Sequence, residues 1–119
     1  MSLKLKYRVG TKITFEAAHY LPMYSGECRR LHGHTYTVIV EVEGKPKNGM
    51  VLDFKTLRQK IKGIISNLDH YDLNTMIDYP TAENIATWIF KRLKEELPDL
   101  YKVRVYEGLN NYAEVYRDS

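Results

Sequence analysis

The sequence predicts an α+β domain in which a four-stranded antiparallel sheet carries two antiparallel helices on one face. Three observations favour this class. Segments rich in β-branched and aromatic residues occur as two pairs, one in each half of the chain. Two amphipathic segments with helical periodicity lie between the pairs. The length of 119 residues argues for one domain that spans residues 1–119.

The first two strands are expected over residues 5–20 and 31–43, because both segments are rich in β-branched and aromatic residues. Residues 21–30 contain proline, serine and glycine and are predicted to form the loop between them. A turn at residues 44–49 follows the second strand, and its Asn-Gly pair is favoured in turns.

The first helix is expected to begin after Asp53, a favourable N-cap residue, and to run to about Asn67. A connection rich in Asp, Asn and His follows over residues 68–79. The second helix is expected to start with Thr81 as its cap and to end at Pro98. Each helix has one apolar face, formed by Leu57, Ile61, Ile64, Ile65 and Leu68 in the first and by Ile85, Trp88, Ile89, Leu93 and Leu97 in the second.

The last two strands are expected over residues 103–107 and 112–116, joined by a hairpin loop at residues 108–111. With both helices on one face, the other face of the sheet needs a cover. Tyrosines and valines on both sides of the strands indicate that a partner subunit supplies it.

Composition limits the classes of function. Apolar residues make up 44% of the chain, which is typical of a globular protein. The chain has no apolar run long enough for a bilayer and no signal-peptide core at its N-terminus, so we expect a cytoplasmic protein without a membrane partner. A single cysteine fits a reducing compartment. The net charge of +3 is spread along the chain, which argues against a nucleic-acid partner and is compatible with an anionic substrate.

Three of the four histidines lie within sixteen residues of one another. His32 and His34 are two residues apart, so a strand would point both side chains to the same face. His19 ends the neighbouring predicted strand. Three imidazoles with an open fourth position are typical of catalytic zinc, and zinc suits a site without a carboxylate or thiolate close by. The alternative is that these are ordinary surface or capping histidines.

Cys28 has three interpretations. It could be a fourth metal ligand that closes a structural site, a small buried apolar residue, or a catalytic thiol beside the metal. The loop around it has no apolar periodicity. Arg29 and Arg30 follow it and would stabilise a thiolate, which favours the catalytic interpretation.

Two other segments carry possible chemistry. Asp69 and His70 are adjacent and could act as an oriented acid/base pair, or His70 could interact with the end of a helix. Glu107 follows an apolar strand and by itself resembles an exposed strand-end carboxylate. As a functional residue, it could accept two hydrogen bonds from an amidine-like ring edge.

Taken together, these segments resemble the 6-pyruvoyl-tetrahydropterin synthase / 6-carboxytetrahydropterin synthase family. The six matching segments occur in the family's order and cover nearly the whole chain: Phe15–His19, Cys28–His34, Leu52–Phe54, Leu68–His70, Pro80–Asn84 and Tyr106–Glu107. The resemblance implies the tunnelling fold, in which the sheets of several subunits join into a closed barrel and trimers usually stack as hexamers.

The resemblance also implies the role of each matching residue. His19, His32 and His34 would hold Zn²⁺, Cys28 would be the catalytic thiol with Asp69 and His70 as acid/base partners from a neighbouring subunit, Glu107 would anchor the pterin ring, and Thr81 would lie near that ring.

The family's substrate is 7,8-dihydroneopterin triphosphate. We expect a zinc-dependent lyase that forms 6-carboxy-5,6,7,8-tetrahydropterin, a precursor of 7-deazaguanine nucleosides such as queuosine, and releases acetaldehyde and triphosphate. One alternative is 6-pyruvoyl-tetrahydropterin synthesis from the same substrate. A folate-type branch uses a glutamate in the cysteine region, where this chain has Glu27 beside Cys28. An alternative of another class is a non-catalytic zinc module closed by Cys28.

Overall fold

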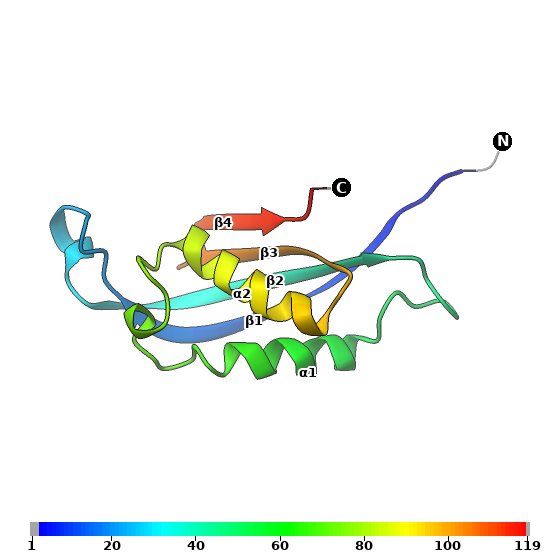
Figure 1. The fold of residues 1–119 in the computed structure, drawn as a ribbon, viewed down its shortest axis with the longest axis horizontal. Helices are drawn as coiled ribbons and strands as arrows, with labels where there is room; N and C mark the ends of the chain where they lie inside the picture. Colours follow the sequence, from blue (N-terminus) through cyan, green and yellow to red (C-terminus); the bar gives the residue numbers. More distant parts are fainter. Residues whose placement is uncertain (1–2, 119) are drawn as a thin grey trace.

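The chain runs through two strands, two helices and two further strands in this computed structural model, which describes residues 3–118 (Figure 1). The elements are β1 (Tyr7–His19), β2 (His32–Gly44), α1 (Phe54–Ile65), α2 (Ala82–Glu96), β3 (Leu100–Glu107) and β4 (Asn111–Tyr116). Two single turns of 3-10 helix, η1 (Gly26–Arg29) and η2 (Leu73–Thr75), lie within the predicted loop and connection.

The strands of the described residues form one antiparallel sheet in the order β1-β2-β3-β4. β1 and β2 are paired along their whole length, from Tyr7 opposite Gly44 to His19 opposite His32. The predicted four-stranded antiparallel sheet is confirmed. Its central strands are β2 and β3, and its edges are β1 and β4.

Both helices lie on one side of the sheet and run in opposite directions, as predicted (Figure 1). The predicted caps are confirmed. The Asp53 side chain accepts a hydrogen bond from the Thr56 N–H, and the Thr81 hydroxyl accepts one from the Asn84 N–H. Within residues 3–118, neither helix is long and apolar enough to cross a membrane.

The core fills the space between the sheet and the helices. Alternate residues of the strands point into it, as the period of two requires. Its fully buried members include Val38, Val40, Val103 and Val105 from the sheet and Leu57, Ile61, Ile85, Ile89 and Leu93 from the helices. Burial of these apolar side chains determines which residues of each strand face the helices.

The third strand begins at Leu100, so the prediction of a start at Val103 is wrong by three residues. The reason is a bulge. Val42 pairs with Leu100 while the neighbouring Glu41 pairs with Lys102, which leaves Tyr101 as an extra residue on β3. Leu100 and Val103 therefore both point into the core, and this spacing of three hides the strand from a period-two search.

The second face of the sheet is polar, and the expectation of valines on both faces is wrong. One row across the four strands consists of Lys12, Ile39, Arg104 and Glu114, and the next consists of Thr14, Thr37, Tyr106 and Tyr112. The valines of β2 and β3 are buried on the helix side. The open face therefore combines charges, hydroxyls and tyrosines, and an apolar interface does not fit it.

Replacement by alanine should change the stability of the fold in opposite directions at Gly10 and Gly63. A Cβ at Gly10 in β1 would lie 2.7 Å from the backbone oxygen of Val40, whereas a Cβ at Gly63 in α1 would meet nothing within 4 Å. We expect Gly10→Ala to destabilise the fold by about 1–3 kcal/mol through overpacking. Gly63→Ala should stabilise it by about 0.5–1 kcal/mol through helix propensity. Urea unfolding of both variants measures these changes, and a stable Gly10→Ala protein would contradict the close strand approach.

Candidate functional site

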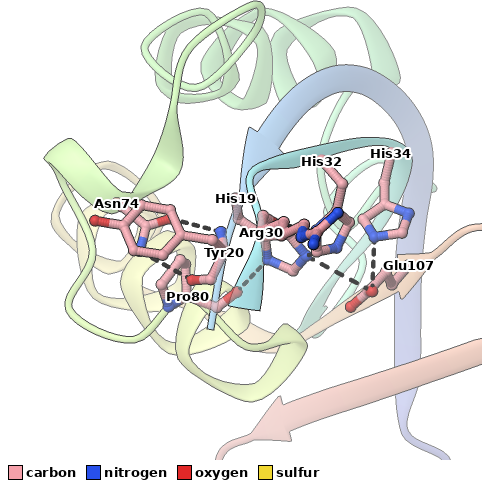
Figure 2. A network of polar contacts seen from close by, with 8 residues as sticks. All are labelled: His19, Tyr20, Arg30, His32, His34, Asn74, Pro80 and Glu107. Carbon is pink, nitrogen blue, oxygen red and sulfur yellow. Dashed lines mark hydrogen bonds and ion pairs between the residues drawn. The ribbon is translucent and has the colours of Figure 1, made fainter. Parts of the chain in front are cut away.

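Three histidines and one glutamate meet at one end of the sheet (Figure 2). His19 is the last residue of β1, and it lies directly opposite His32, the first residue of β2. His34 follows two residues along β2, and its side chain lies beside that of His32, as predicted. Glu107 is the last residue of β3. The sheet topology thus gathers four polar side chains where three strands end or begin.

The ligand atoms of this group lie within 4.8 Å of one another. His19 Nε2 is 3.1 Å from His32 Nε2, and His34 Nε2 is 2.9 Å from Glu107 Oε1. His19 is fully buried, and the other three are partly buried. The four atoms surround a common centre of a size that suits a metal ion.

The contacts of the Nδ1 atoms determine which tautomer His19 and His32 adopt. His19 Nδ1 is 2.7 Å from the carbonyl oxygen of Pro80, and His32 Nδ1 is 2.6 Å from that of Arg30. A carbonyl oxygen only accepts hydrogen bonds, so both Nδ1 atoms carry the hydrogen. In the neutral rings, both Nε2 atoms then present lone pairs to each other across 3.1 Å. Such a contact needs a cation between or beside the rings, and a carbonyl behind each imidazole is typical of metal-ligating histidines.

His34 fits the same interpretation. Its Nε2 atom is buried and has no hydrogen-bond partner among residues 3–118, although Glu107 Oε1 lies 2.9 Å from it. Burial lowers the pKa of His34 from its ordinary value, and Glu107 opposes that shift. A neutral His34 leaves its unpaired polar atom available as a ligand. The residues present therefore fit a divalent metal.

The position of Glu107 removes one reason for choosing zinc over other metals. The sequence argument assumed no carboxylate close to the three histidines, and that assumption is wrong, because Glu107 Oε1 also lies 3.7 Å from His19 Nε2. The glutamate comes from a strand far along the chain, so spacing could not reveal it. A set of three imidazoles and one carboxylate suits zinc but also other first-row metals.

Cys28 lies outside the metal-binding group, which within residues 3–118 consists of His19, His32, His34 and Glu107. It is in η1, partly exposed, and its carbonyl accepts a hydrogen bond from the Leu21 N–H. The hypothesis of a zinc site closed by Cys28 needs the thiol among the ligands, where the structure has a carboxylate instead.

A cavity of about 310 Å³ brings three of the predicted site residues together. Cys28, Thr81 and Glu107 line it, although they come from η1, the cap of α2 and the end of β3. Tyr24 and Tyr112 also contribute to its wall. A planar ring in this cavity would lie beside the metal-binding group, because Glu107 belongs to both.

Asp69 and His70 contact each other, but they lie at the outer edge of β1 and not in this cavity. Asp69 Oδ2 is 3.1 Å from His70 Nδ1, and Asp69 Oδ1 accepts a hydrogen bond from the Glu16 N–H. The His70 side chain is 77% exposed and borders a separate hollow of about 500 Å³, which His34 also lines. The Asp69 carboxylate therefore contacts an imidazole that is largely exposed in the single chain.

Comparison with known proteins decides the family. The sequence profile described as "6-pyruvoyl tetrahydropterin synthase" matches residues 8–118. The chain belongs to this family. The fold agrees with this assignment, since a solved 6-pyruvoyl tetrahydropterin synthase from Caenorhabditis elegans superimposes with a TM-score of 0.84 at 26% identity. That alignment covers 99% of this chain and 100% of the other.

Two curated relatives have names that describe different activities. A "dihydroneopterin monophosphate aldolase" from Pyrococcus furiosus is 40% identical over 107 residues, covering 87% of this chain and 92% of its own. A "6-carboxy-5,6,7,8-tetrahydropterin synthase" from Synechocystis is 40% identical over 115 residues, covering 88% and 89%. These two relatives have the same sequence identity to this chain.

Sequence reasoning missed the groups that hold the ligands in place. The carbonyls of Pro80 and Arg30 carry no side-chain signal, and no motif marks a backbone oxygen as a hydrogen-bond acceptor. Asn74 was also not predicted as a site residue, although it follows the Asp69-His70 pair by only four residues. Its amide contacts the backbone of Tyr20, next to His19.

The four histidines of the chain supply a matched test of the metal site. We expect His34→Ala to weaken metal binding by more than about 100-fold, because losing a ligand costs more than losing an outer partner. His70→Ala, which removes the remaining histidine, should bind metal as the wild type does. Metal content after dialysis against a weak chelator measures both. An equal loss of bound metal in the two variants would contradict the assignment of His34 as a ligand.

Proposed function

We propose that this chain is a zinc-dependent lyase that converts 7,8-dihydroneopterin triphosphate to 6-carboxy-5,6,7,8-tetrahydropterin, with release of acetaldehyde and triphosphate. The observation that carries the proposal is the shared position of Glu107, which lies in the metal-binding group and also lines the cavity with Cys28 and Thr81. Relatives named 6-carboxytetrahydropterin synthases support the choice of reaction.

The three histidines would hold zinc through their Nε2 atoms. When bound, zinc would act as a Lewis acid toward the hydroxyl groups of the substrate side chain. The Nδ1 contacts of His19 and His32 with backbone carbonyls support this role, because they orient the rings and increase their basicity.

Glu107 would anchor the pterin ring. A carboxylate can accept two parallel hydrogen bonds from the amidine-like edge of such a ring, and Glu107 is placed where the cavity meets the metal-binding group. Thr81 borders the same cavity, and its hydroxyl is engaged as the cap of α2. A ring held there would put its side chain toward the three histidines.

Cys28 would transfer protons at the substrate side chain, because it lines the same cavity as Glu107. Asp69 and His70 would act as its acid/base partners from a second subunit. The exposure of His70 and its position on the outer edge of β1 support this arrangement.

The sheet edges support a homo-oligomer, with a trimer or stacked trimers as in the family's barrel. β4 is an edge strand over its whole length, and the segment containing Asp69 and His70 covers only the end of β1 near Glu16 and Ala18. Joining β1 of one subunit to β4 of the next would close both edges. It would also carry His70 toward Tyr112 in the neighbour's cavity wall.

A second candidate is an aldolase that acts on dihydroneopterin monophosphate. The relative with that name is 40% identical to this chain, and so is the Synechocystis relative named for the carboxy reaction. Sequence identity therefore favours the two reactions equally. Relatives from both Synechocystis and Haemophilus influenzae are named 6-carboxy-5,6,7,8-tetrahydropterin synthases, which leads us to place the carboxy reaction first.

Product analysis tests the proposed reaction. We expect the zinc-loaded protein to consume dihydroneopterin triphosphate and to yield a carboxypterin and acetaldehyde, identified by mass. Cys28→Ala should lower turnover by about 100-fold or more while keeping its zinc, because a proton-transfer group is lost.

Other products decide against the proposal. A pyruvoyl product would assign the pyruvoyl branch, and a faster reaction with the monophosphate would assign the aldolase. Zinc binding without consumption of either pterin would leave a non-catalytic module. A Glu107→Gln variant that loses its zinc would make this residue a ligand rather than a ring anchor.

Mixing two inactive variants tests whether subunits share a site. Cys28→Ala and His70→Ala should each be inactive alone, and reassembled mixtures should recover up to about a quarter of the activity if neighbours complete each site. Activity is measured after the two proteins are unfolded and refolded together. Recovery should be absent if both residues act within one chain, which would overturn the shared arrangement.

A further inference from the structure

The side chain of Asn74 holds the backbone of Tyr20 with both of its polar atoms (Figure 2). Asn74 Oδ1 accepts a hydrogen bond from the Tyr20 N–H at 2.9 Å, and Asn74 Nδ2 donates one to the Tyr20 carbonyl at 2.9 Å. These bonds fix the two consecutive peptide groups on either side of Tyr20. The residues are 54 positions apart, so the contact ties distant parts of the chain together.

The position of this contact matters because the sheet ends there. His19 and His32 form the last rung of the β1-β2 ladder, and strand ends open more readily than strand centres. Beyond Tyr20 the chain leaves the sheet and enters the loop that carries Cys28. The Leu21 N–H donates to the Cys28 carbonyl, so the start of this loop also sets the position of Cys28.

Asn74 is itself held firmly. Its backbone N–H donates to Asp72 Oδ1 at 3.0 Å, and the neighbouring Leu73 is fully buried in the core. Asp72 forms a parallel bridge with Ala18 of β1. The amide therefore projects from a segment that the two preceding residues, Asp72 and Leu73, anchor to β1 and to the core.

We propose that Asn74 is a positioning residue, which orients the His19 imidazole and the Cys28 loop by clamping the backbone of Tyr20. Pro80 fixes the His19 ring from its Nδ1 side, and Asn74 fixes the peptide that follows the same residue. The consequence for Cys28 chemistry rests on the proposed function, whereas the consequence for metal binding does not.

The variant Asn74→Asp removes one hydrogen bond to Tyr20 without changing the size of the side chain. It keeps the shape and the acceptor for the Tyr20 N–H, but it replaces the donor with a carboxylate oxygen that faces a carbonyl. We expect the apo-protein of this variant to bind Zn²⁺ at least tenfold more weakly than the wild type. Losses of this size are typical when a residue that orients a metal ligand is replaced. The reaction of Cys28 with a thiol reagent should change in rate at least threefold, because its loop is released. The Co²⁺-loaded protein should show an altered visible absorption spectrum.

Two controls isolate the effect. Asn48→Asp makes the same charge change in the exposed turn that follows β2, far from the site in the sheet. Ile61→Val removes one methyl group from the core and lowers stability without touching the site. Both should keep wild-type Zn²⁺ affinity and wild-type thiol reactivity.

The proposal is overturned if Asn74→Asp loses stability as Ile61→Val does and keeps wild-type Zn²⁺ affinity, Co²⁺ spectrum and Cys28 reactivity. Should Asn74→Asp fail to fold, Asn74→Ala removes both hydrogen bonds without adding a charge, and the same thresholds apply to it. None of these measurements uses a pterin. A failure of the proposed reaction therefore leaves their outcome unaffected.

Discussion

The register of β1 against β2 is the constraint on which the site depends. His19 and His32 occupy the same rung, and the strand period of two brings His34 to the same face. A slip of one residue would turn these side chains to the open face of the sheet. The buried residues Phe15 and Val38 prevent that slip, because it would expose them as well. The apolar core thus specifies the position of a polar group that lies at its end.

That polar group is costly for the metal-free chain. His19 is fully buried, and its Nε2 faces the lone pair of His32 Nε2. Within the described part of the chain, His34 Nε2 has no hydrogen-bond partner and lies against the Glu107 carboxylate. Buried polar atoms without partners lower stability. The carbonyls of Pro80 and Arg30 satisfy only the outer nitrogens. Such an arrangement persists because the surrounding sheet and helices impose it, and a bound cation would satisfy all the inner atoms at once.

The sequence predicts what local patterns encode. The strand alternation, the helix caps at Asp53 and Thr81, and the two-residue spacing of His32 and His34 all depend on neighbours along the chain, and the structure confirms them. Glu107 was identified, but its contact with His34 was not, because that contact depends on the pairing of β3 with β2.

The contacts made by backbone atoms could not be predicted at all. The carbonyl of Pro80 lies 61 positions from His19 in the sequence, and only the packing of the segment before α2 brings them together. The clamp from Asn74 to Tyr20 has the same character. Similarly, the bulge at Tyr101 shifts β3 by one residue and disguises its start. Each of these features comes from tertiary structure, where side-chain periodicity carries no signal.

The two halves of the proposed catalytic machinery lie on different sides of one strand. The imidazole of His19 faces the helix side of β1, whereas the backbone of Glu16, three residues earlier, holds Asp69 and His70 at the free edge. β1 thus connects the group of His19, His32, His34 and Glu107, which could hold a metal ion, to the exposed pair of Asp69 and His70. In a closed barrel, each copy of β1 would support its own metal and serve the next subunit's cavity. The polar open face fits that assembly, because lysine, arginine, glutamate and threonine side chains can line a hydrated channel but cannot form an apolar interface.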